Sequence, residues 1–364
     1  MSQPITNDSP SPNPNDSSIT NANPAANPNP AARHITVQCP GTVANLVCGF
    51  DILGMALQAP FDIMEVRLLD EPKVIVSSKN GFPLPTDPAQ NTAGAPLLEM
   101  LAELNGDSRP PADADPRPAD PGPTDPRPAN WPTRPIGFEV IIDKKIKPGS
   151  GIGSSAASAA GAVVAANHLL GNIFSKEDLV RFALFGEKVA SGVKHADNIA
   201  PCIYGGITLI RSIFPLDIVS IPAPQLHVTV VHPQIEVRTS DARQILRKQV
   251  LLKDAIRQWG NIAGLVAGFM KNDYDLIGRS LEDVIIEPVR SMLIPGFDEV
   301  KHSCKTAGAL GGGISGSGPS IFMLSRNETT ARQLEKIMKD IYQRIGLDHH
   351  TYVTTINQQG VKII

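Results

Sequence analysis

The sequence predicts an α+β fold with two domains. Apolar runs rich in β-branched residues, which are typical of strands, are concentrated early in the chain, whereas helical patterns and strands mix in its later part. This grouping differs from the regular alternation of strands and helices that builds a parallel sheet. The length of 364 residues corresponds to about two domains of roughly 150 residues each.

Two proline-rich segments stand apart from this body. Residues 1–30 and 107–135 hold 17 of the 33 prolines. Both segments are polar and nearly free of large apolar side chains, so neither can bury enough surface to offset the entropy of ordering. We therefore expect a disordered tail over 1–33 and a disordered or polyproline-II-like surface insertion over 107–135. They act as spacers or, alternatively, as PxxP-type ligands for a partner.

Hydrophobic periodicity places the elements of the remaining body. The expected strands cover 34–39, 61–69, 73–78, 136–146, 205–211, 226–231, 319–325 and 352–356. The expected helices cover 96–105, 156–170, 176–191, 239–250, 254–270, 273–283, 297–307 and 328–345. Prolines cluster at 215–225, which predicts a boundary between domains over 34–220 and 221–364.

Composition excludes several classes of protein. A net charge of -3 gives no polycationic surface for nucleic acid. No run approaches the roughly 18 to 20 apolar residues of a membrane span, and the N-terminus lacks the pattern of a secretory signal. The cysteines at 39, 48, 202 and 304 form no CxxC pair, which favours buried reduced thiols and a cytoplasmic protein.

The strongest functional signal is the segment 148–157. Its alternating glycines Gly149, Gly151 and Gly153 let the backbone approach a ligand closely, and they directly precede an Ala-rich helix. The free N–H groups at a helix start favour a phosphate, and Ser154 and Ser155 can add hydroxyl ligands. The segment matches neither the Walker A loop nor the dinucleotide fingerprint. A plain Gly/Ser hinge with a helix cap is the alternative.

Two further elements accompany this loop. A second glycine-rich run, 311–319, precedes an apolar strand. Near the start of the chain, Asn45 and Asp51 lie in an otherwise apolar turn, where an unpaired polar group would be costly. Ordinary turn capping is the alternative explanation for this pair.

Taken together, the three elements resemble the motifs of the GHMP kinases, and the first motif, 45–54, is closest to that of the homoserine kinase family. Glu187, His195, Asn198 and Arg243 add to the resemblance, as does the segment 287–296. The departures are Gly41, Val47, Cys48 and Ile152, and Val47 in place of the usual glycine needs an allowed backbone angle at that position. The resemblance implies a ribosomal-S5-like N-terminal ATP-binding domain and a ferredoxin-like C-terminal GHMP domain.

The resemblance also implies ATP and Mg²⁺ as cofactors. Ser155, with Ser154 as an alternative, and Glu187 would be the magnesium ligands, and Asn91 would lie beside the adenine. The catalytic residues would be Asn198, Glu187 and Ser155. The phosphate loop would comprise Pro148, Gly149, Ser150, Gly151, Ile152, Gly153, Ser154, Ser155, Ala156 and Ala157.

For the substrate site, the resemblance implies Asn45, Asp51, His195, Asn198, Arg243 and Arg290. Asp51 suits an ammonium group, and Arg243 and Arg290 suit a carboxylate, with Arg238 ranked below Arg243. Asn198 cannot accept a proton, so the hydroxyl proton would pass to the γ-phosphate or to solvent.

The expected activity is the phosphorylation of L-homoserine to O-phospho-L-homoserine on the route to threonine. The expected partners are L-homoserine and a second copy in a homodimer, with no nucleic acid and no membrane. One alternative is another GHMP kinase acting on mevalonate or a sugar. The other is an inactive nucleotide-binding regulator.

Overall fold

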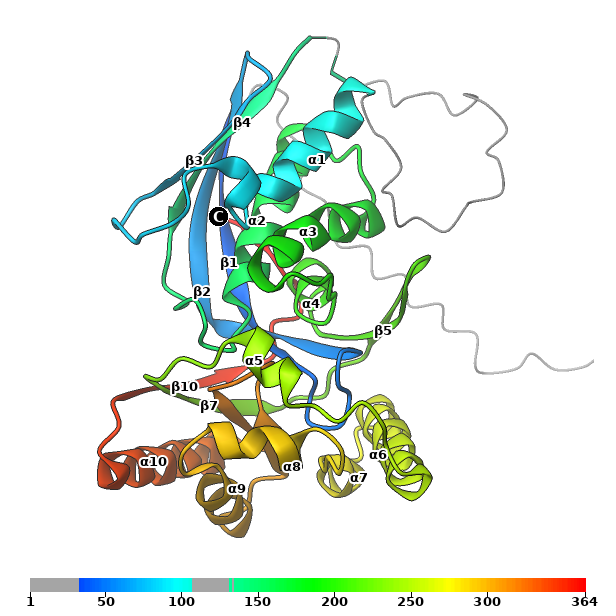
Figure 1. The fold of residues 1–364 in the computed structure, drawn as a ribbon, viewed down its shortest axis with the longest axis vertical. Coiled ribbons are helices and arrows are strands. Elements are labelled where there is room, and N and C mark those ends of the chain that lie inside the picture. The colour runs from blue at the N-terminus through cyan, green and yellow to red at the C-terminus, as the bar shows by residue number, and fades with distance from the viewer. Residues whose placement is uncertain (1–32, 107–130, 133) are drawn as a thin grey trace, which may run out of the picture.

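The computed structural model describes residues 33–106, 131, 132 and 134–364 (Figure 1). The proline-rich tail, apart from Arg33, and most of the expected insertion at 107–135 lie outside the described residues.

A seven-stranded sheet forms the larger layer of the fold. Its main path runs β11-β1-β2-β4-β3, and β5 and β6 continue from one end of β2. The long β2 pairs with β4 through its second half and with β5 through Leu53–Met55. The strands are β1 (His34–Ala44), β2 (Leu53–Leu69), β3 (Val74–Ser78), β4 (Gly137–Asp143), β5 (Ile207–Ile213), β6 (Leu216–Ile221) and β11 (Lys362–Ile363).

Four helices lie on one side of this sheet (Figure 1): α1 (Gly94–Asn105), α2 (Ser154–Leu169), α3 (Lys176–Ser191) and α4 (Ile199–Tyr204). Helix α2 packs directly on β1 and β2, and its small residues allow this close approach. A side chain at Gly161 would collide with the Cys39 sulfur on β1, so the helix can lie this close to the sheet there. The helix that follows the glycine loop is therefore packed closely against the sheet.

A four-stranded antiparallel sheet forms the second layer, in the order β10-β7-β9-β8. Its strands are β7 (His227–Pro233), β8 (Gly311–Ile314), β9 (Ile321–Ser325) and β10 (His349–Thr355). Successive side chains of these strands point to opposite faces of the sheet and so contribute to two hydrophobic cores. Val230 and Phe322 join the larger core, whereas Val231 and Ile321 pack with the C-terminal helices.

The remaining helices belong to this second half of the chain (Figure 1). They are α5 (Thr239–Gln244), α6 (Leu252–Lys271), α7 (Tyr274–Ser280), α8 (Glu287–Arg290), α9 (Phe297–Thr306) and α10 (Glu328–Ile345). Short 3₁₀ turns occur at Pro88–Gln90 and Ser291–Leu293.

The predicted α+β class with two domains is confirmed by the two sheets. The helix expected over 239–250 is shorter, because α5 ends at Gln244 and the following apolar residues Ile245 and Val250 are exposed rather than packed as a helical face. The boundary at 220/221 stays a prediction; β6 ends at Ile221, and the last strand, β11, returns to pair with β1 in the first sheet.

All four cysteines are buried and unpaired, as the sequence predicted. In the part of the chain that the structure describes, no helix has the length and apolar character needed to cross a bilayer.

Candidate active site

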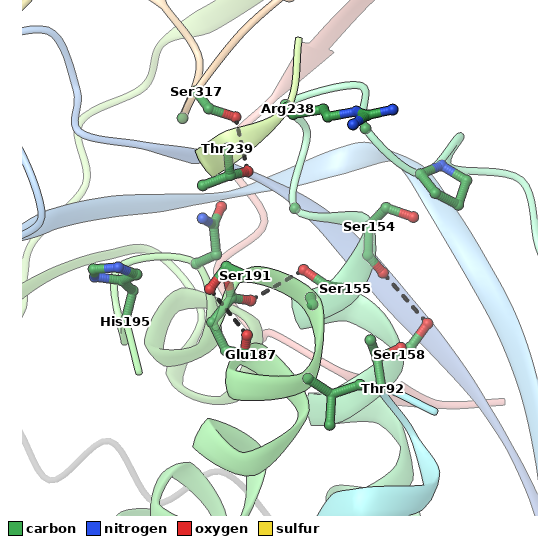
Figure 2. Close-up of a pocket in the computed structure, with 18 of the residues that line it drawn as sticks. Thr92, Ser154, Ser155, Ser158, Glu187, Ser191, His195, Arg238, Thr239 and Ser317 are labelled. Atoms are coloured by element: carbon green, nitrogen blue, oxygen red, sulfur yellow. Dashed lines mark hydrogen bonds between the residues drawn. The ribbon is translucent and has the colours of Figure 1, made fainter. Parts of the chain in front are cut away.

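A cavity of about 600 Å³ opens between the two halves of the fold. All three sequence motifs reach it, through Asn45 and Asp51, through the loop around Gly151, and through Gly316 and Ser317. Figure 2 shows Ser155 and Glu187 pointing toward one another at its floor, with Thr239 and Ser317 on the opposite side. The motifs are thus brought together although more than ninety residues separate each from the next in the sequence.

The glycine loop adopts the conformation that its composition predicts. Gly149, Gly151 and Gly153 all have positive φ, at 74°, 79° and 65°. Gly153 is the N-cap residue of α2, and no described side chain caps the helix start, so its first-turn N–H groups are left for a ligand. A Cβ at Gly153 would overlap the Thr42 hydroxyl, so only glycine fits there.

Some residues of the predicted phosphate loop do not line the cavity. Ile152, Ala156 and Ala157 are fully buried in the core, and Ser150 is buried with its hydroxyl accepting a hydrogen bond from the Ile152 N–H. Ser154 lines the cavity, but its hydroxyl donates to the Ile146 carbonyl at 2.8 Å. These residues shape the loop, and any contact from them to phosphate would come from backbone N–H groups.

A buried ion pair anchors this loop, and the sequence interpretation missed it. Lys144 Nζ donates to Asp62 Oδ2 at 2.6 Å, to the Ser154 carbonyl at 2.7 Å and to Ser158 Oγ at 2.9 Å. Asp62 Oδ1 in turn accepts from the N–H groups of Lys145 and Ile146, at 2.7 and 2.8 Å. All three ammonium protons and both carboxylate oxygens are used, which is the condition under which a buried pair holds a defined geometry.

Ser155 and Glu187 form the pair that the motif comparison singled out. Ser155 Oγ donates to Glu187 Oε2 at 3.0 Å. Glu187 is 9% exposed, and burial raises the pKa of its carboxyl group. No ion pair to Glu187 occurs among the described residues, so its carboxylate lacks a counter-charge.

This arrangement fits Mg²⁺. A serine hydroxyl beside an uncompensated carboxylate supplies two of the hard oxygen ligands that Mg²⁺ takes, with water and phosphate oxygens completing the set. The described residues contain no cluster of three or more His, Cys, Asp and Glu side chains able to hold a metal by themselves. A site that depends on phosphate oxygens would have this composition.

One part of the cavity, near the residues that precede α1, is apolar. Its wall consists of Phe82, Pro83, Leu84 and Pro85, a run that the sequence interpretation did not single out. Asn91 also lines this part, but its side chain is engaged with the backbone: Nδ2 donates to the Pro85 carbonyl at 2.7 Å, and Oδ1 accepts from the Ala93 N–H at 2.8 Å. Asn91 therefore holds the apolar wall in place, as a helix-leading turn residue.

The first motif folds into a left-handed turn. Asn45, Leu46 and Val47 have φ of 72°, 40° and 67°, and Asp51 has 62°. Such angles are rare for a β-branched residue like Val47 and cost roughly 1–3 kcal/mol. Asn45 offsets part of this cost, because Oδ1 accepts from the Asp51 N–H at 3.0 Å and Nδ2 donates to the Gly316 carbonyl at 2.8 Å. Its amide thus supports the site more than it reaches into it.

Asp51, Arg243 and His195 form a charged cluster. Arg243 Nη2 lies 3.0 and 3.1 Å from the two Asp51 oxygens and 3.0 Å from His195 Nε2. Because arginine only donates, Nε2 is the acceptor, and the His195 proton lies on Nδ1, 3.8 Å from Asp51. Burial lowers the pKa of His195, which favours this neutral form. Arg243 Nε is buried without a hydrogen-bond partner among the described residues.

Arg290 lies beside this cluster. Its Nε donates to the Ala242 carbonyl at 3.0 Å and Nη1 to the Gly316 carbonyl at 3.2 Å. Burial and the neighbouring Arg243 lower its pKa to about 10, so the guanidinium stays charged at neutral pH. The Phe50 ring centroid lies 4.8 Å from Cζ of Arg290 and 5.4 Å from Cζ of Arg243, which orients both guanidiniums. Arg238 also lines the cavity but contacts Glu236 instead.

Two adjacent polar residues complete the centre. Asn198 Oδ1 accepts from Thr42 Oγ1 at 2.6 Å, which leaves its amide NH₂ unengaged by any described residue. Asp197 is a buried carboxyl group in the cavity wall that the sequence interpretation missed. Burial, together with the carboxylates of Asp51 and Glu187, raises its pKa to about 8. A group that exchanges a proton near neutral pH therefore lies next to Asn198.

One buried glutamine, Gln258, links the first motif to the segment that carries Arg290. Gln258 on α6 donates through Nε2 to the Cys48 carbonyl at 2.8 Å and to Asp283 Oδ1 at 3.0 Å. Asp283 accepts from the N–H groups of Ile285, Ile286 and Glu287 and so caps the turn that carries Arg290. Gln258 thereby joins the motif loop around Asp51 to the helix that presents Arg290.

Comparison with protein families agrees with this geometry. Residues 128–206 match the GHMP kinases N terminal domain, and residues 265–344 match the GHMP kinases C terminal domain. A mevalonate kinase crystal structure has a TM-score of 0.60 at 15% identity, with coverage of 89% of this chain and 99% of that chain, and shows the shared fold alone.

Curated and solved relatives narrow the family. The chain is 41% identical to the homoserine kinase of Chloroherpeton thalassium over 340 residues, 91% of this chain and 100% of the relative. It is 37% identical to that of Methanocella arvoryzae, covering 91% and 97% of the two chains. The homoserine kinase structure from Cytophaga hutchinsonii matches with a TM-score of 0.81 and 44% identity, over 92% and 98%. The chain belongs to the homoserine kinase family of the GHMP kinases.

Proposed function

We propose that this chain transfers the γ-phosphoryl group of ATP to the hydroxyl of L-homoserine, with Mg²⁺, yielding O-phospho-L-homoserine and ADP. The observation that carries the proposal is the cluster of Asp51 with Arg243 and Arg290. It offers one carboxylate and two guanidiniums within one wall of the cavity.

A zwitterionic substrate matches this cluster. Its ammonium would bind Asp51, and its carboxylate would bind Arg243, whose buried Nε lacks a partner among the described residues, together with Arg290. On binding, the Asp51–Arg243 ion pair would break, and two ion pairs with the substrate would replace it: Asp51 with the ammonium, and Arg243 with the carboxylate. Mevalonate has no ammonium group for Asp51, and a sugar has no carboxylate for the arginines, so neither rival matches both signs of charge in this cluster.

The nucleotide would occupy the rest of the cavity. The start of α2 would hold the phosphates, the apolar wall at 82–85 would contact the adenine, and Ser155 and Glu187 would hold Mg²⁺. Bound Mg²⁺ would neutralise phosphate charge during transfer. The intact Ser155–Glu187 contact also argues against an inactive nucleotide-binding regulator.

For the proton of the hydroxyl we propose Asn198 and Asp197 as a working pair. The free NH₂ of Asn198 would donate to the substrate oxygen and orient it. Asp197 would accept the proton in its ionised form, as an alternative to direct loss to the γ-phosphate or to solvent. Phosphoryl transfer depends mainly on alignment and charge neutralisation, so a base with a pKa near 8 would suffice.

The setting of the reaction belongs to the same proposal. The product would feed threonine biosynthesis, and the four buried, unpaired cysteines suit the reducing cytoplasm.

The decisive experiment measures ADP release with L-homoserine, mevalonate and galactose in turn. We expect turnover with L-homoserine, and its absence would contradict the proposal. Arg243→Ala should raise KM for L-homoserine by about 10- to 100-fold, the value of a charge-assisted hydrogen bond. Arg238→Ala is the matched control, because this arginine lines the same cavity but contacts Glu236, and we expect a change below about threefold. Equal effects would contradict the assignment of Arg243.

A further inference from the structure

Thr42 lies where the phosphate loop meets the substrate side of the site. It is near the end of β1, and its side chain is fully buried. Its hydroxyl donates to Asn198 Oδ1 at 2.6 Å, and its backbone N–H donates to the Ile152 carbonyl at 3.2 Å. One residue of the first sheet therefore contacts both Asn198 and the loop that leads into α2.

The hydroxyl of Thr42 lies directly against Gly153, the N-cap residue of α2. A Cβ built on Gly153 would lie 1.9 Å from Thr42 Oγ1 and 3.1 Å from Asn198 Oδ1. The two side-chain oxygens therefore meet at the start of α2, where free N–H groups favour phosphate. The group that would orient the substrate oxygen and the helix that would hold the phosphates are thus positioned from the same point.

The contact with Thr42 determines which end of the Asn198 amide is free. An asparagine amide has an oxygen that accepts and an NH₂ group that donates, and the two ends have nearly the same shape. A separation of 2.6 Å is typical of a hydroxyl that donates to an oxygen and is short for an amide nitrogen. Because Thr42 holds the oxygen, the NH₂ group is left for a ligand in the cavity that Asn198 lines.

The described residues next to Asn198 offer its side-chain oxygen no other donor. An asparagine that precedes a helix, as Asn198 precedes α4, normally accepts from the second or third N–H of that helix. Here the second N–H, that of Ala200, donates to the Ala196 carbonyl at 2.7 Å, and the third residue, Pro201, has no N–H. The side chain accordingly makes no capping hydrogen bond in the described part of the chain. The orientation of the amide therefore depends on Thr42.

We propose that Thr42 is a positioning residue for phosphoryl transfer, because its hydroxyl fixes the Asn198 amide with the NH₂ group toward the substrate hydroxyl. This inference rests on the proposed function, in which that NH₂ group orients the attacking oxygen. Thr42 is buried outside the cavity lining, so it acts through Asn198. A reversed amide would present its oxygen, which would accept the hydroxyl proton and draw it away from Asp197.

The first experiment replaces Thr42 in the full chain and measures ADP release with L-homoserine. Thr42→Val keeps the shape of the side chain but has no hydroxyl. We expect kcat to fall about 10- to 100-fold, with KM for ATP and for L-homoserine each changed less than about threefold, because alignment is lost rather than binding. Thr42→Ser keeps the hydroxyl and loses a buried methyl group, so it should unfold at a lower temperature and yet keep kcat within about threefold of the native value.

Thr208 provides the matched control. This threonine of β5 is also fully buried, and its Oγ1 has no hydrogen-bond partner among the described residues. Thr208→Val should therefore leave kcat unchanged, and circular dichroism establishes that each variant is folded. A Thr42→Val variant with native kcat overturns the proposal. So does a Thr42→Ser variant that loses as much kcat as Thr42→Val, because the effect would then follow packing and not the hydroxyl.

The second experiment needs no turnover and so separates this inference from the proposed function. The Asn198 NH₂ group gives a pair of signals in the proton–nitrogen spectrum of the isotope-labelled chain, which are assigned by their loss in Asn198→Asp. Thr42→Val should shift these signals, whereas Thr208→Val should not, and signals that stay in place in Thr42→Val overturn the inference. A native chain that releases no ADP with L-homoserine contradicts the proposed function, and the spectrum still decides whether Thr42 holds the amide.

Discussion

Removing Lys144 tests whether the phosphate loop depends on a buried charge. Lys144→Met takes away three hydrogen bonds, at 2.6, 2.7 and 2.9 Å, and leaves the fully buried Asp62 without its counter-charge. Breaking a buried pair from one side costs about 3–5 kcal/mol. The total free energy of unfolding of a natural protein is about 5–15 kcal/mol, so this cost is a large share of it. We therefore expect a large drop in the urea concentration at the midpoint of unfolding.

The neighbouring lysine is the matched control. Lys145 is 54% exposed in its side chain and pairs with Asp143 at 3.4 Å, so Lys145→Met should cost less than about 1 kcal/mol. Adding Asp62→Asn to Lys144→Met removes the stranded charge and should recover part of the loss. KM for ATP should rise in Lys144→Met, because the first turn of α2 loses its anchor. Equal costs for the two lysine variants, or no recovery in the double variant, would refute the reasoning.

Three further predictions follow from the site. The pKa of Asp197 is about 8 in the folded chain but about 3.9 in the unfolded chain. Protonated Asp197 therefore contributes fully to the free energy of unfolding below about pH 4, and this contribution is lost as the pH rises toward 8. Asp197→Asn should therefore flatten the decline in the free energy of unfolding between pH 5 and 8, and an unchanged slope in urea titrations would contradict this. Glu187→Gln should raise the Mg²⁺ concentration for half-maximal ADP release at least tenfold, whereas Glu177→Gln on the same helix should not. Gln258→Met should raise KM for L-homoserine about tenfold and leave KM for ATP unchanged; equal rises in both would indicate a general loss of structure.

The sequence predicted those elements best whose ends are marked locally. The helices expected at 176–191 and 328–345 match α3 and α10 at both ends. Ser175 and Asn327 cap their starts through side-chain hydrogen bonds, and left-handed Gly192 and Gly346 end them. Such signals depend on neighbouring residues alone.

Two strands that depend on pairing with a partner strand were missed. Strand β8, Gly311–Ile314, has low strand propensity and exists because it pairs with β9. Strand β6 lies inside the proline cluster at 215–225 that we took for a boundary, and it is held by pairing with β5. Local composition contains no signal for either.

The same distinction applies to the site. Residues with a motif role, such as Ser155 and Glu187, were named because the sequence resembles the motifs of the GHMP kinases. Lys144 and Gln258 were missed because their partners lie 82 and 210 residues away, at Asp62 and Cys48. A supporting residue is recognisable only once the fold has placed its partner. In the sequence alone, nothing distinguishes Lys144 from the other lysines.

The second glycine-rich run shows why the two halves of the site act together. Ser315 Oγ donates to the Gly151 carbonyl at 2.6 Å, so this run contacts the phosphate loop. One residue later, the Gly316 carbonyl accepts from both Asn45 and Arg290 on the substrate side. The spacing between the two ends of the cavity is therefore set by two consecutive backbone positions. Because phosphoryl transfer depends on in-line alignment more than on any single acid or base, we expect a change in this short segment to lower the rate of transfer more than the affinity for ATP or for L-homoserine.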